Sequence, residues 1–281
     1  MKWHLSAVTA LISATPSLAA GTGPYDAAHS TDITLPRHTI YMPRNPPANE
    51  SLPVLIWGNG ACSANGTLFG NLLTNIASHG FIAIASGRPN GRGRTTVDYM
   101  KDALDWIERR AGAGGTRGKY ATVDASRVAV AGQSCGGLEA YQMRDDPRVQ
   151  YLGIFNSGFL DVPGFLGGLL GIPGEGPETI EEVDLPVFYF LGGEEDIAYP
   201  NGMADYAALS GVPKWVGNFP VGHMGTYAKP EGGEFGVAAV NWLKWVLKKD
   251  TSQAEWFTGG GAEAAGWEEV ASEGLDGLLT F

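Results

Sequence analysis

The sequence predicts an α/β protein in which a doubly wound, mostly parallel β-sheet is flanked by helices within a single domain. Two observations support this prediction. Apolar runs without polar alternation, such as LPVLIW (52–57), indicate strands buried on both faces, as the strands of parallel sheets are. Helical stretches separate these runs along most of the chain, and strands that alternate with helices build a parallel sheet covered by helices.

The N-terminal half supplies three expected strands and two expected helices. HTIYMP (38–43) stands before a proline-rich turn and is expected at an edge of the sheet. LPVLIW (52–57) and FIAIAS (81–86) are expected as buried strands on either side of a helical stretch at 68–80. The segment 96–112 carries apolar residues at helical spacing and ends at glycine, which predicts an amphipathic helix.

The same pattern continues in the C-terminal half. RVAVAG (127–132) predicts a strand, and GGLEAYQM (136–143) opens a helix directly after it. VQYLGIFNS (149–157) and LPVFYFLGG (185–193) predict two more strands. FGVAAVNWLKWVLKKD (235–250) has the spacing of an amphipathic helix that closes the fold.

Two segments interrupt the alternation and set the expected domain limits. We expect one globular domain over residues 21–250. Within it, the glycine-rich insertion 157–184 is long for a loop of a compact domain, and such loops are lids, substrate-binding segments or disordered chain. Residues 251–281 are rich in glycine and glutamate, so we expect a C-terminal extension there.

The first 20 residues have the pattern of a secretory signal peptide. Lys2 precedes an apolar run of about a dozen residues, and small residues stand before a cleavage site near Ala19 or Ala20. The alternative is a buried first helix. No later apolar segment reaches the length of about 18 residues that a membrane-spanning helix needs. We therefore expect a secreted, extracellular protein without a membrane span.

Charge and composition disfavour several classes of partner. A net charge of −11 at pH 7 argues against nucleic acid or anionic membranes as partners, and we expect a monomer. The two cysteines stand far apart and no cluster of histidine and cysteine exists, so we expect no metal site. Asn49 and Asn65 begin Asn-x-Ser/Thr triplets and are candidate glycosylation sites.

One G-x-S-x-G pattern, from Gly132 to Gly136, marks Ser134 as the candidate nucleophile. The pattern is informative because a predicted strand precedes it and a predicted helix follows it. A serine in this turn is exposed above the sheet edge, and flanking glycines let strand and helix approach closely. The N–H groups of the helix N-terminus point to where an oxyanion would form.

A serine nucleophile needs a base that takes its proton and an acid that orients the base. In proteins with this strand–turn–helix pattern, the acid follows the serine along the chain and the histidine follows the acid. His223 is the only histidine after Ser134 and lies in a loop before the last helix. Asp196, in the acidic turn after LPVFYFLGG, is the first choice of acid. Glu194, Glu195 and Asp161 remain alternatives, since each also follows a predicted strand.

Two backbone N–H groups are expected to form an oxyanion hole. One belongs to Cys135, the residue after the nucleophile. The second is expected in the loop after LPVLIW, where Ala61 is the first choice and Gly60 the second.

Five segments carry a resemblance to a known group of proteins: LIWGNGAC (55–62), ASHGF (77–81), VAGQSCGG (130–137), FLGGEEDIAYPNG (190–202) and VGHMGTY (221–227). Together they resemble secreted microbial α/β-hydrolases related to dienelactone hydrolases, cutinase-like esterases and polyester (PET) hydrolases. The resemblance implies a cofactor-free carboxylic ester hydrolase of the α/β-hydrolase fold, with nucleophile, acid and base at the three positions chosen above. Cysteine after the nucleophile and Gly-Ala in the oxyanion loop depart from polyester hydrolases.

The expected function is therefore a serine esterase that acts through an acyl-enzyme on small acyl or aryl esters, including those of plant walls. Alternatives are a polyester or cutin hydrolase, a secreted serine peptidase of the same fold, and a non-catalytic binding protein. Aromatic and apolar residues near the predicted loops are candidates for the substrate pocket or for core: Trp57, Phe159, Phe165, Leu166, Tyr199, Met224 and Tyr227.

The two cysteines are expected to form a disulfide. Cys62 directly follows Ala61, and Cys135 directly follows Ser134. Because the two oxyanion donors must converge on one oxygen, their neighbours lie close together, and an oxidising compartment would pair them. The alternative is two buried thiols.

Overall fold

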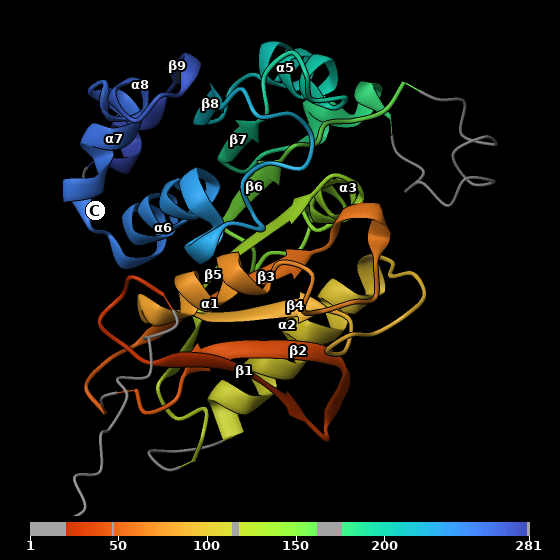
Figure 1. The fold of residues 1–281 in the computed structure, drawn as a ribbon, viewed down its shortest axis with the longest axis vertical. Helices are drawn as coiled ribbons and strands as arrows, with labels where there is room; N and C mark the ends of the chain where they lie inside the picture. Colours follow the sequence, from red (N-terminus) through yellow and green to blue (C-terminus); the bar gives the residue numbers. More distant parts are fainter. Residues whose placement is uncertain (1–20, 47, 114–117, 162–175, 280–281) are drawn as a thin grey trace, which may run out of the picture.

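A computed structural model of the chain describes residues 21–46, 48–113, 118–161 and 176–279. The proposed signal peptide (1–20) and Phe165 lie outside these residues. Within them the chain forms one nine-stranded sheet with the strand order β1-β2-β4-β3-β5-β6-β7-β8-β9 (Figure 1).

The strands are β1 (Ala27–Asp32), β2 (Leu35–Pro43), β3 (Leu52–Gly58), β4 (Ile82–Ser86), β5 (Val123–Gln133), β6 (Tyr151–Phe155), β7 (Val187–Leu191), β8 (Lys214–Asn218) and β9 (Glu268–Glu273). The α-helices are α1 (Gly70–Ser78), α2 (Val97–Ala113), α3 (Cys135–Tyr141), α5 (Tyr199–Ala208), α6 (Gly233–Lys248), α7 (Ala254–Thr258) and α8 (Gly261–Ala264). Short 3₁₀ turns are η1 (Gly60–Cys62), η2 (Pro177–Glu182), η3 (Pro230–Gly232), η4 (Thr251–Gln253) and η5 (Leu275–Leu278).

The prediction of a mostly parallel sheet covered by helices is confirmed. From β4 to β8 every neighbouring pair is parallel, whereas β1, β2 and β9 pair antiparallel. Side chains of β3 alternate between two cores: Val54 and Ile56 pack with α2, whereas Leu55 and Trp57 pack with α1 and α6. This alternation explains why a central strand has no polar residue.

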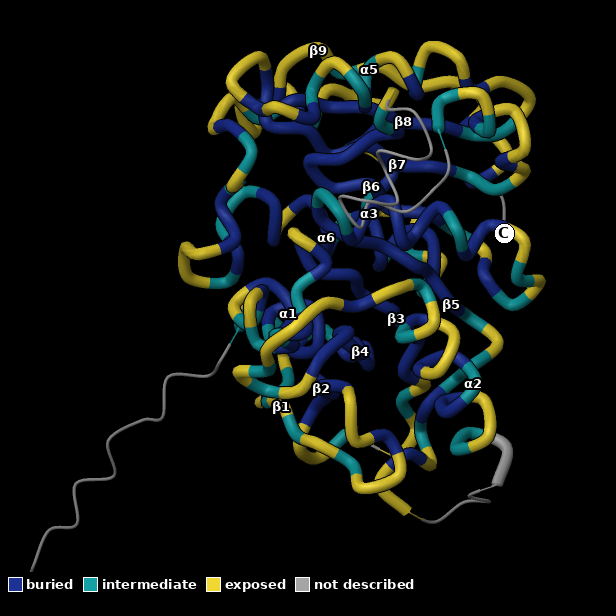
Figure 2. Tube along the Cα trace, turned by 90° about the vertical axis from the view of Figure 1, so that its right-hand side faces the viewer, coloured by how far each residue is buried: buried dark blue, intermediate teal, exposed yellow. Residues whose placement is uncertain are grey.

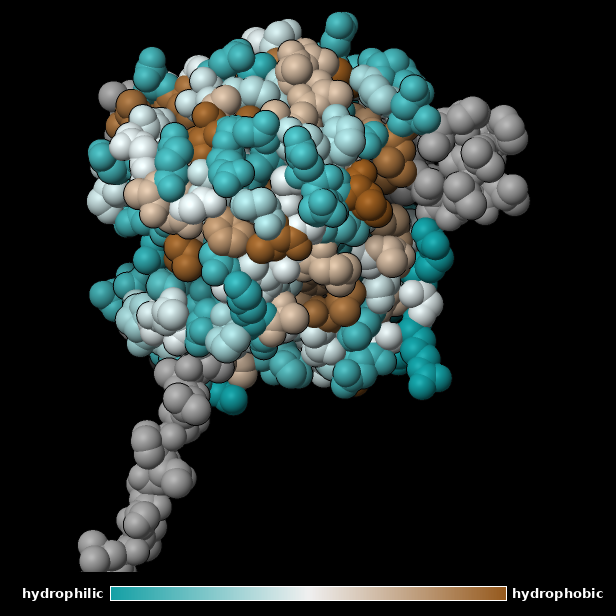
Figure 3. All heavy atoms as spheres, turned by 45° about the horizontal axis from the view of Figure 1, so that its top comes forward, coloured by the Kyte–Doolittle hydropathy of each residue, from teal (hydrophilic) through white to brown (hydrophobic). Residues whose placement is uncertain are grey.

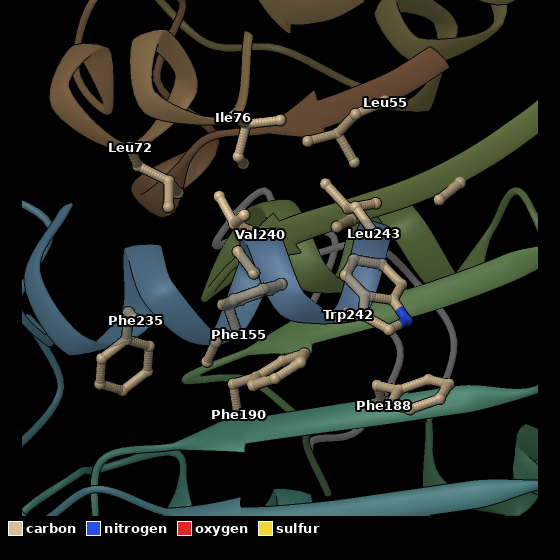
Figure 4. Packing of buried hydrophobic residues seen from close by; sticks show 14 of the residues in the cluster. Leu55, Leu72, Ile76, Phe155, Phe188, Phe190, Phe235, Val240, Trp242 and Leu243 are labelled. Carbon is tan, nitrogen blue, oxygen red and sulfur yellow. The ribbon is translucent and has the colours of Figure 1, made fainter. Parts of the chain in front are cut away.

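Helix α6 packs beside α1 on one face of the sheet. In Figure 4, Val240 and Leu243 point toward Leu72 and Ile76 of α1, while Trp242 lies on the side of the strands. The ring centroid of Trp242 lies 5.7 Å from that of Phe188 in β7. Helices α2, α3 and α5 contribute to the core on the opposite face of the sheet. Figure 2 shows these central strands buried and the loops exposed.

The prediction that 38–43 forms an edge strand is wrong. Strand β2 lies between β1 and β4 and is hydrogen-bonded to both. The edge belongs to β1, AAHSTD, whose alternation of intermediate and exposed residues is too polar to stand out as a strand in the sequence. Both His38 and Thr39 of β2 are buried as a result.

The C-terminal extension completes the same sheet. Strand β9 pairs with β8, and three side chains after residue 251, Phe257, Trp267 and Leu275, belong to the core that contains α6. Neither β8, KWVGN with a single short apolar stretch, nor β9, which is largely exposed, has the hydrophobic pattern of a central strand.

The topology places a reversal of strand order at the carboxyl ends of β3 and β5. The chain runs from β3 through α1 to β4 on one side, and from β4 through α2 to β5 on the other side of β3. Helices α1 and α2 lie on opposite faces of the sheet, so the strand order reverses between β3 and β5. In open α/β sheets ligands bind at such a reversal.

Candidate active site

Ser134 occupies a sharp turn between β5 and α3, at this reversal point. Its φ of 53° and ψ of −123° are rare for a residue with a side chain. The N–H of Ser134 donates to the carbonyl of Phe155 (3.0 Å), and its own carbonyl accepts from Gly137 (2.8 Å). These bonds hold the strained turn in place.

The glycines around Ser134 are required by close backbone contacts. A Cβ on Gly132 would lie 2.2 Å from the carbonyl oxygen of Gly136, and a Cβ on Gly136 would lie 2.2 Å from the carbonyl carbon of Gly58. No side chain fits at either position. Helix α3 therefore starts against both β5 and the end of β3.

His223 lies between Ser134 and Asp196. Its Nε2 is 3.0 Å from the Ser134 Oγ, and its Nδ1 is 2.6 Å from the Asp196 Oδ1. Asp196 is buried, whereas the His223 side chain is 21% exposed and therefore reachable by solvent or substrate. A carboxylate beside Nδ1 favours the proton there, which leaves Nε2 free to accept the serine proton.

Hydrogen bonds keep Asp196 ionised although it is buried. Besides His223, its carboxylate accepts from the N–H groups of Ala198 (2.9 Å) and Gly192 (3.0 Å) and from the Asn156 side chain (2.8 Å). Burial raises the pKa of Asp196, but these hydrogen bonds, that of His223 above all, lower the pKa by more. The net pKa lies below the usual value, so a negative charge faces His223.

Asn156, at the end of β6, connects the acid to the histidine loop and was not foreseen from the sequence. It is fully buried with a left-handed φ of 43°. Its Nδ2 donates to Asp196 and, at 3.4 Å, to the carbonyl of Gly222, and its Oδ1 accepts from the Tyr227 hydroxyl. The only sequence signal was an asparagine near the end of the predicted strand 149–157.

Gln133 connects the histidine loop to the loop after β3. Its Nε2 donates to the carbonyl of His223 (3.0 Å). A Cβ on Gly60 would lie 2.0 Å from the Gln133 Oε1, so the Gly60 backbone packs directly on this side chain. One buried amide therefore sets the spacing between the two loops.

The predicted oxyanion loop forms the turn η1 at the end of β3. Ala61 and Cys62 adopt left-handed φ values of 56° and 47°. The Asn59 side chain holds this turn by donating to the carbonyls of Ser63 (2.8 Å) and Ser86 (2.5 Å). Ala61 is exposed beside the turn of Ser134.

The predicted disulfide between Cys62 and Cys135 is confirmed. Their Cα atoms lie 5.1 Å apart, so the bond joins the first residue of α3 to the loop after β3. The carbonyl of Cys62 also accepts from the N–H of Thr95 (2.7 Å). These contacts bring Ala61 and Cys135, the two proposed oxyanion donors, to the same place.

Glu139 lies buried behind this loop. Its Oε1 accepts from the Thr95 hydroxyl (2.8 Å), while its Oε2 has no hydrogen-bond partner within the described ranges. Burial raises the pKa of Glu139 to about 7, although the Thr95 hydrogen bond and the charge of Arg94 oppose the shift. No sequence pattern indicated this carboxyl.

Some of the candidate pocket residues are buried in the core, and others are exposed. Trp57 and Phe159 are core residues, and Phe159 stacks on Tyr141 with ring centroids 4.1 Å apart. Tyr227 is buried with its hydroxyl on Asn156. The burial of all three favours the core alternative over a place in a substrate pocket.

The remaining candidates lie near the surface. Met224 is 74% exposed beside His223, and Tyr199 is partly exposed with its hydroxyl on Glu269. The alternative acids Glu194, Glu195 and Asp161 are exposed, whereas Asp196 is the carboxylate that is hydrogen-bonded to His223 Nδ1.

Apolar side chains are exposed on the two loops that carry Asp196 and His223. Ile197 is 78% exposed and Val221 42% exposed, in addition to Met224. Contacts between the loops, such as the Val221 N–H on the carbonyl of Gly192 (3.1 Å), keep these residues together. Figure 3 turns the top of the view in Figure 1, where α5 and β8 lie, toward the reader. On this face apolar side chains form separate patches among hydrophilic ones.

The two candidate glycosylation sites differ in how exposed they are. Asn49 is exposed, whereas Asn65 is partly buried and its Oδ1 accepts from the backbone and the hydroxyl of Thr67. Among the described residues there is no group of histidine, cysteine and carboxylate side chains that could hold a metal ion. No helix within the described part of the chain is both long and apolar enough to span a membrane.

Comparison with known proteins gives the chain no family: no protein-family model matches it, and a search of curated proteins finds no match. The architecture is compatible with the α/β-hydrolase fold. What the site can do therefore follows from its own geometry, in which a serine hydroxyl, an imidazole and a buried carboxylate form one hydrogen-bonded row.

We expect Asn156→Leu to slow the labelling of Ser134 by a serine-directed fluorophosphonate by about 10- to 100-fold. The change removes a donor to Asp196 and the acceptor of Tyr227, and a lost buried hydrogen bond is worth about 1–3 kcal/mol. Tyr227→Phe should slow labelling less. The matched control is Tyr141→Phe, another buried tyrosine whose hydroxyl binds Asp205. Labelling of Asn156→Leu at the wild-type rate would show that Asn156 does not position the acid.

Glu139→Gln should remove a pH dependence of stability. A raised pKa in the folded protein means that Glu139 contributes full stability below its ordinary pKa of 4.5 and loses that contribution as the pH rises through about 7. At pH 8.5 the variant should exceed the wild type in free energy of unfolding by up to about 3 kcal/mol, and at pH 4.5 by little. Urea denaturation at both pH values measures this, with the exposed Glu263→Gln as control.

Proposed function

We propose that this protein is a secreted serine esterase of the α/β-hydrolase type. The observation that carries the proposal is the row of short contacts from Ser134 through His223 to Asp196, with 3.0 Å and 2.6 Å at its two steps. The serine hydroxyl lies beside a base that can take its proton, and this base lies beside a carboxylate that can orient it. The nucleophile's elbow geometry, with flanking glycines in backbone contact, supports the same proposal.

The proposed reaction begins when His223 Nε2 removes the proton of Ser134 Oγ as that oxygen attacks an ester carbonyl. Asp196 holds the imidazole and stabilises the positive charge that it acquires. The protonated His223 then donates its proton to the departing alcohol, which leaves an acyl group on Ser134. Water, activated by the same histidine, hydrolyses this acyl-enzyme and restores the free serine.

The oxyanion that forms during each attack is assigned to the N–H groups of Ala61 and Cys135. Cys135 begins α3, and the first N–H groups of a helix have no partner within it. The left-handed backbone at Ala61 and the disulfide at the next residue support a second donor beside it. A preorganised donor of this kind is typically worth about a hundredfold or more in rate.

The exposed apolar residues beside the site favour an apolar acyl or aryl group in the substrate. Ile197 and Met224 are each more than two-thirds exposed, and burial of such side chains against a ligand is favourable by about 25 cal/mol per Å². Cleavage of polyesters or peptides remains a variant of the same mechanism. The disulfide supports an oxidising, extracellular location.

Hydrolysis of p-nitrophenyl butyrate tests the proposal. We expect turnover by the wild type and a loss of about 10⁴-fold or more in kcat for Ser134→Ala and for His223→Asn. Ser252→Ala, at an exposed serine of η4, is the matched control and should retain most activity. A peptide p-nitroanilide in the same assay discriminates the peptidase alternative, and no ester turnover with full folding would reject the esterase.

Removal of the disulfide should impair the reaction more than substrate binding. We expect Cys62→Ser/Cys135→Ser to lower kcat tenfold or more with a small change in KM, because the oxyanion donors act chiefly in the transition state. Its free energy of unfolding should fall by up to about 4 kcal/mol, as the bond closes a separation of 73 residues. Cys62→Ala/Cys135→Ala controls for the added hydroxyls. An unchanged kcat in both pairs would show that the bond does not support the site.

A further inference from the structure

A hollow lined by three arginines lies beside the oxyanion loop. Arg37, Arg88 and Arg92 line it together with Tyr99 and Ala64, and no acidic residue is among its lining residues. Its volume of about 330 Å³ is at the lower end of the range that small ligands occupy. Nothing in the proposed mechanism uses these arginines.

Two of these arginines, Arg88 and Arg92, lie on a loop that is hydrogen-bonded to the segment after η1, whereas Arg37 belongs to β2. Between β4 and α2 the chain reads GRPNGRGRT (87–95), and this loop runs along the segment that follows η1 (Figure 1). The N–H of Gly66 donates to the carbonyl of Arg88 (2.9 Å), and that of Ala64 donates to the carbonyl of Gly93 (3.0 Å). The backbone that carries Arg88 and Arg92 is therefore tied to the oxyanion loop.

Two of the three arginines of the hollow have no ion pair within the described part of the chain. Arg37 pairs with Asp102 and lies over the Tyr99 ring, 4.4 Å from its centroid. Arg88 and Arg92 are exposed, and in the part of the chain that the structure describes neither side chain has an ion pair or a hydrogen bond. Two such charges in one hollow repel each other and attract an anion, in a protein whose net charge is −11.

The hollow lies close enough to Ser134 for one extended substrate to reach both. The Cα atoms of Ala64 and Cys62 are at most about 7 Å apart along an extended chain. Cys62 and Cys135 are 5.1 Å apart, and Cys135 follows Ser134 directly. The edge of the hollow at Ala64 thus lies within about 16 Å of Ser134. A substrate of several linked units can cover a span of this size.

We propose that the hollow binds a carboxylate carried by the ester substrate, at a distance from the ester that Ser134 attacks. The inference rests on the proposed esterase function and narrows its substrates to acidic esters. Guanidinium groups bind carboxylates through paired, charge-assisted hydrogen bonds, and the Tyr99 ring offers a flat apolar contact beside them. Two sources supply such a group: an acidic sugar in an oligosaccharide, and the free end of an aliphatic dicarboxylic acid.

Binding to the full chain with Ser134→Ala tests this proposal independently of turnover. Calorimetry at low ionic strength compares trigalacturonate, maltotriose as its neutral counterpart, azelate and inorganic phosphate. We expect one of the two carboxylate probes to bind, and Arg88→Ser/Arg92→Ser to weaken that binding tenfold or more. Arg44→Ser/Lys119→Ser removes the same charge at a separate hollow beside β1 and should change the affinity less than twofold.

Each result of the calorimetry either identifies the ligand or rejects the proposal. Binding of trigalacturonate alone identifies an acidic sugar, and binding of azelate alone identifies an aliphatic acid. The proposal is overturned if neither binds, if the two double variants weaken binding equally, or if phosphate binds as tightly as the carboxylates. Failure to hydrolyse p-nitrophenyl butyrate would instead reject the esterase function and leave the binding result to stand.

Discussion

The candidate site depends on one backbone contact, the approach of Gly136 at the start of α3 to Gly58 at the end of β3. This contact brings the helix that follows the nucleophile against the strand that leads into the oxyanion loop. Because neither glycine has a side chain, the two segments can lie close enough for the disulfide from Cys135 to Cys62. The strained backbone of Ser134 is the local consequence, held by hydrogen bonds to the neighbouring strand.

The rest of the site is assembled from strand ends further along the sheet. Asn156, Asp196 and His223 follow β6, β7 and β8 in turn, so neighbouring strands deliver neighbouring side chains. Buried amides then set their spacing: Asn156 holds the acid and Gln133 holds the histidine loop. The parallel sheet supplies the approximate positions, and these hydrogen bonds supply the final ones.

Features encoded in local sequence were predictable, whereas those that depend on distant packing were not. The elbow around Ser134 has its own motif, and the order of residues pointed to His223, which is hydrogen-bonded to Ser134, and to Asp196, which is hydrogen-bonded to His223. The edge position of β1 was not predictable from AAHSTD alone. Its residues alternate between partly buried and exposed only because β1 pairs with β2. Nor could the sequence tell that Tyr227 turns inward, because that depends on Asn156, 71 residues away.

The antiparallel pairing of β9 with β8 has a consequence for how the protein is made. Until residues 254–279 leave the ribosome, the outer edge of β8 has no partner and the aromatic core beneath α6 lacks Phe257 and Trp267. An open, apolar strand edge readily pairs with other chains. The nascent protein is therefore most vulnerable to aggregation late in synthesis, and the segment that closes the sheet is one whose composition resembles an unstructured tail.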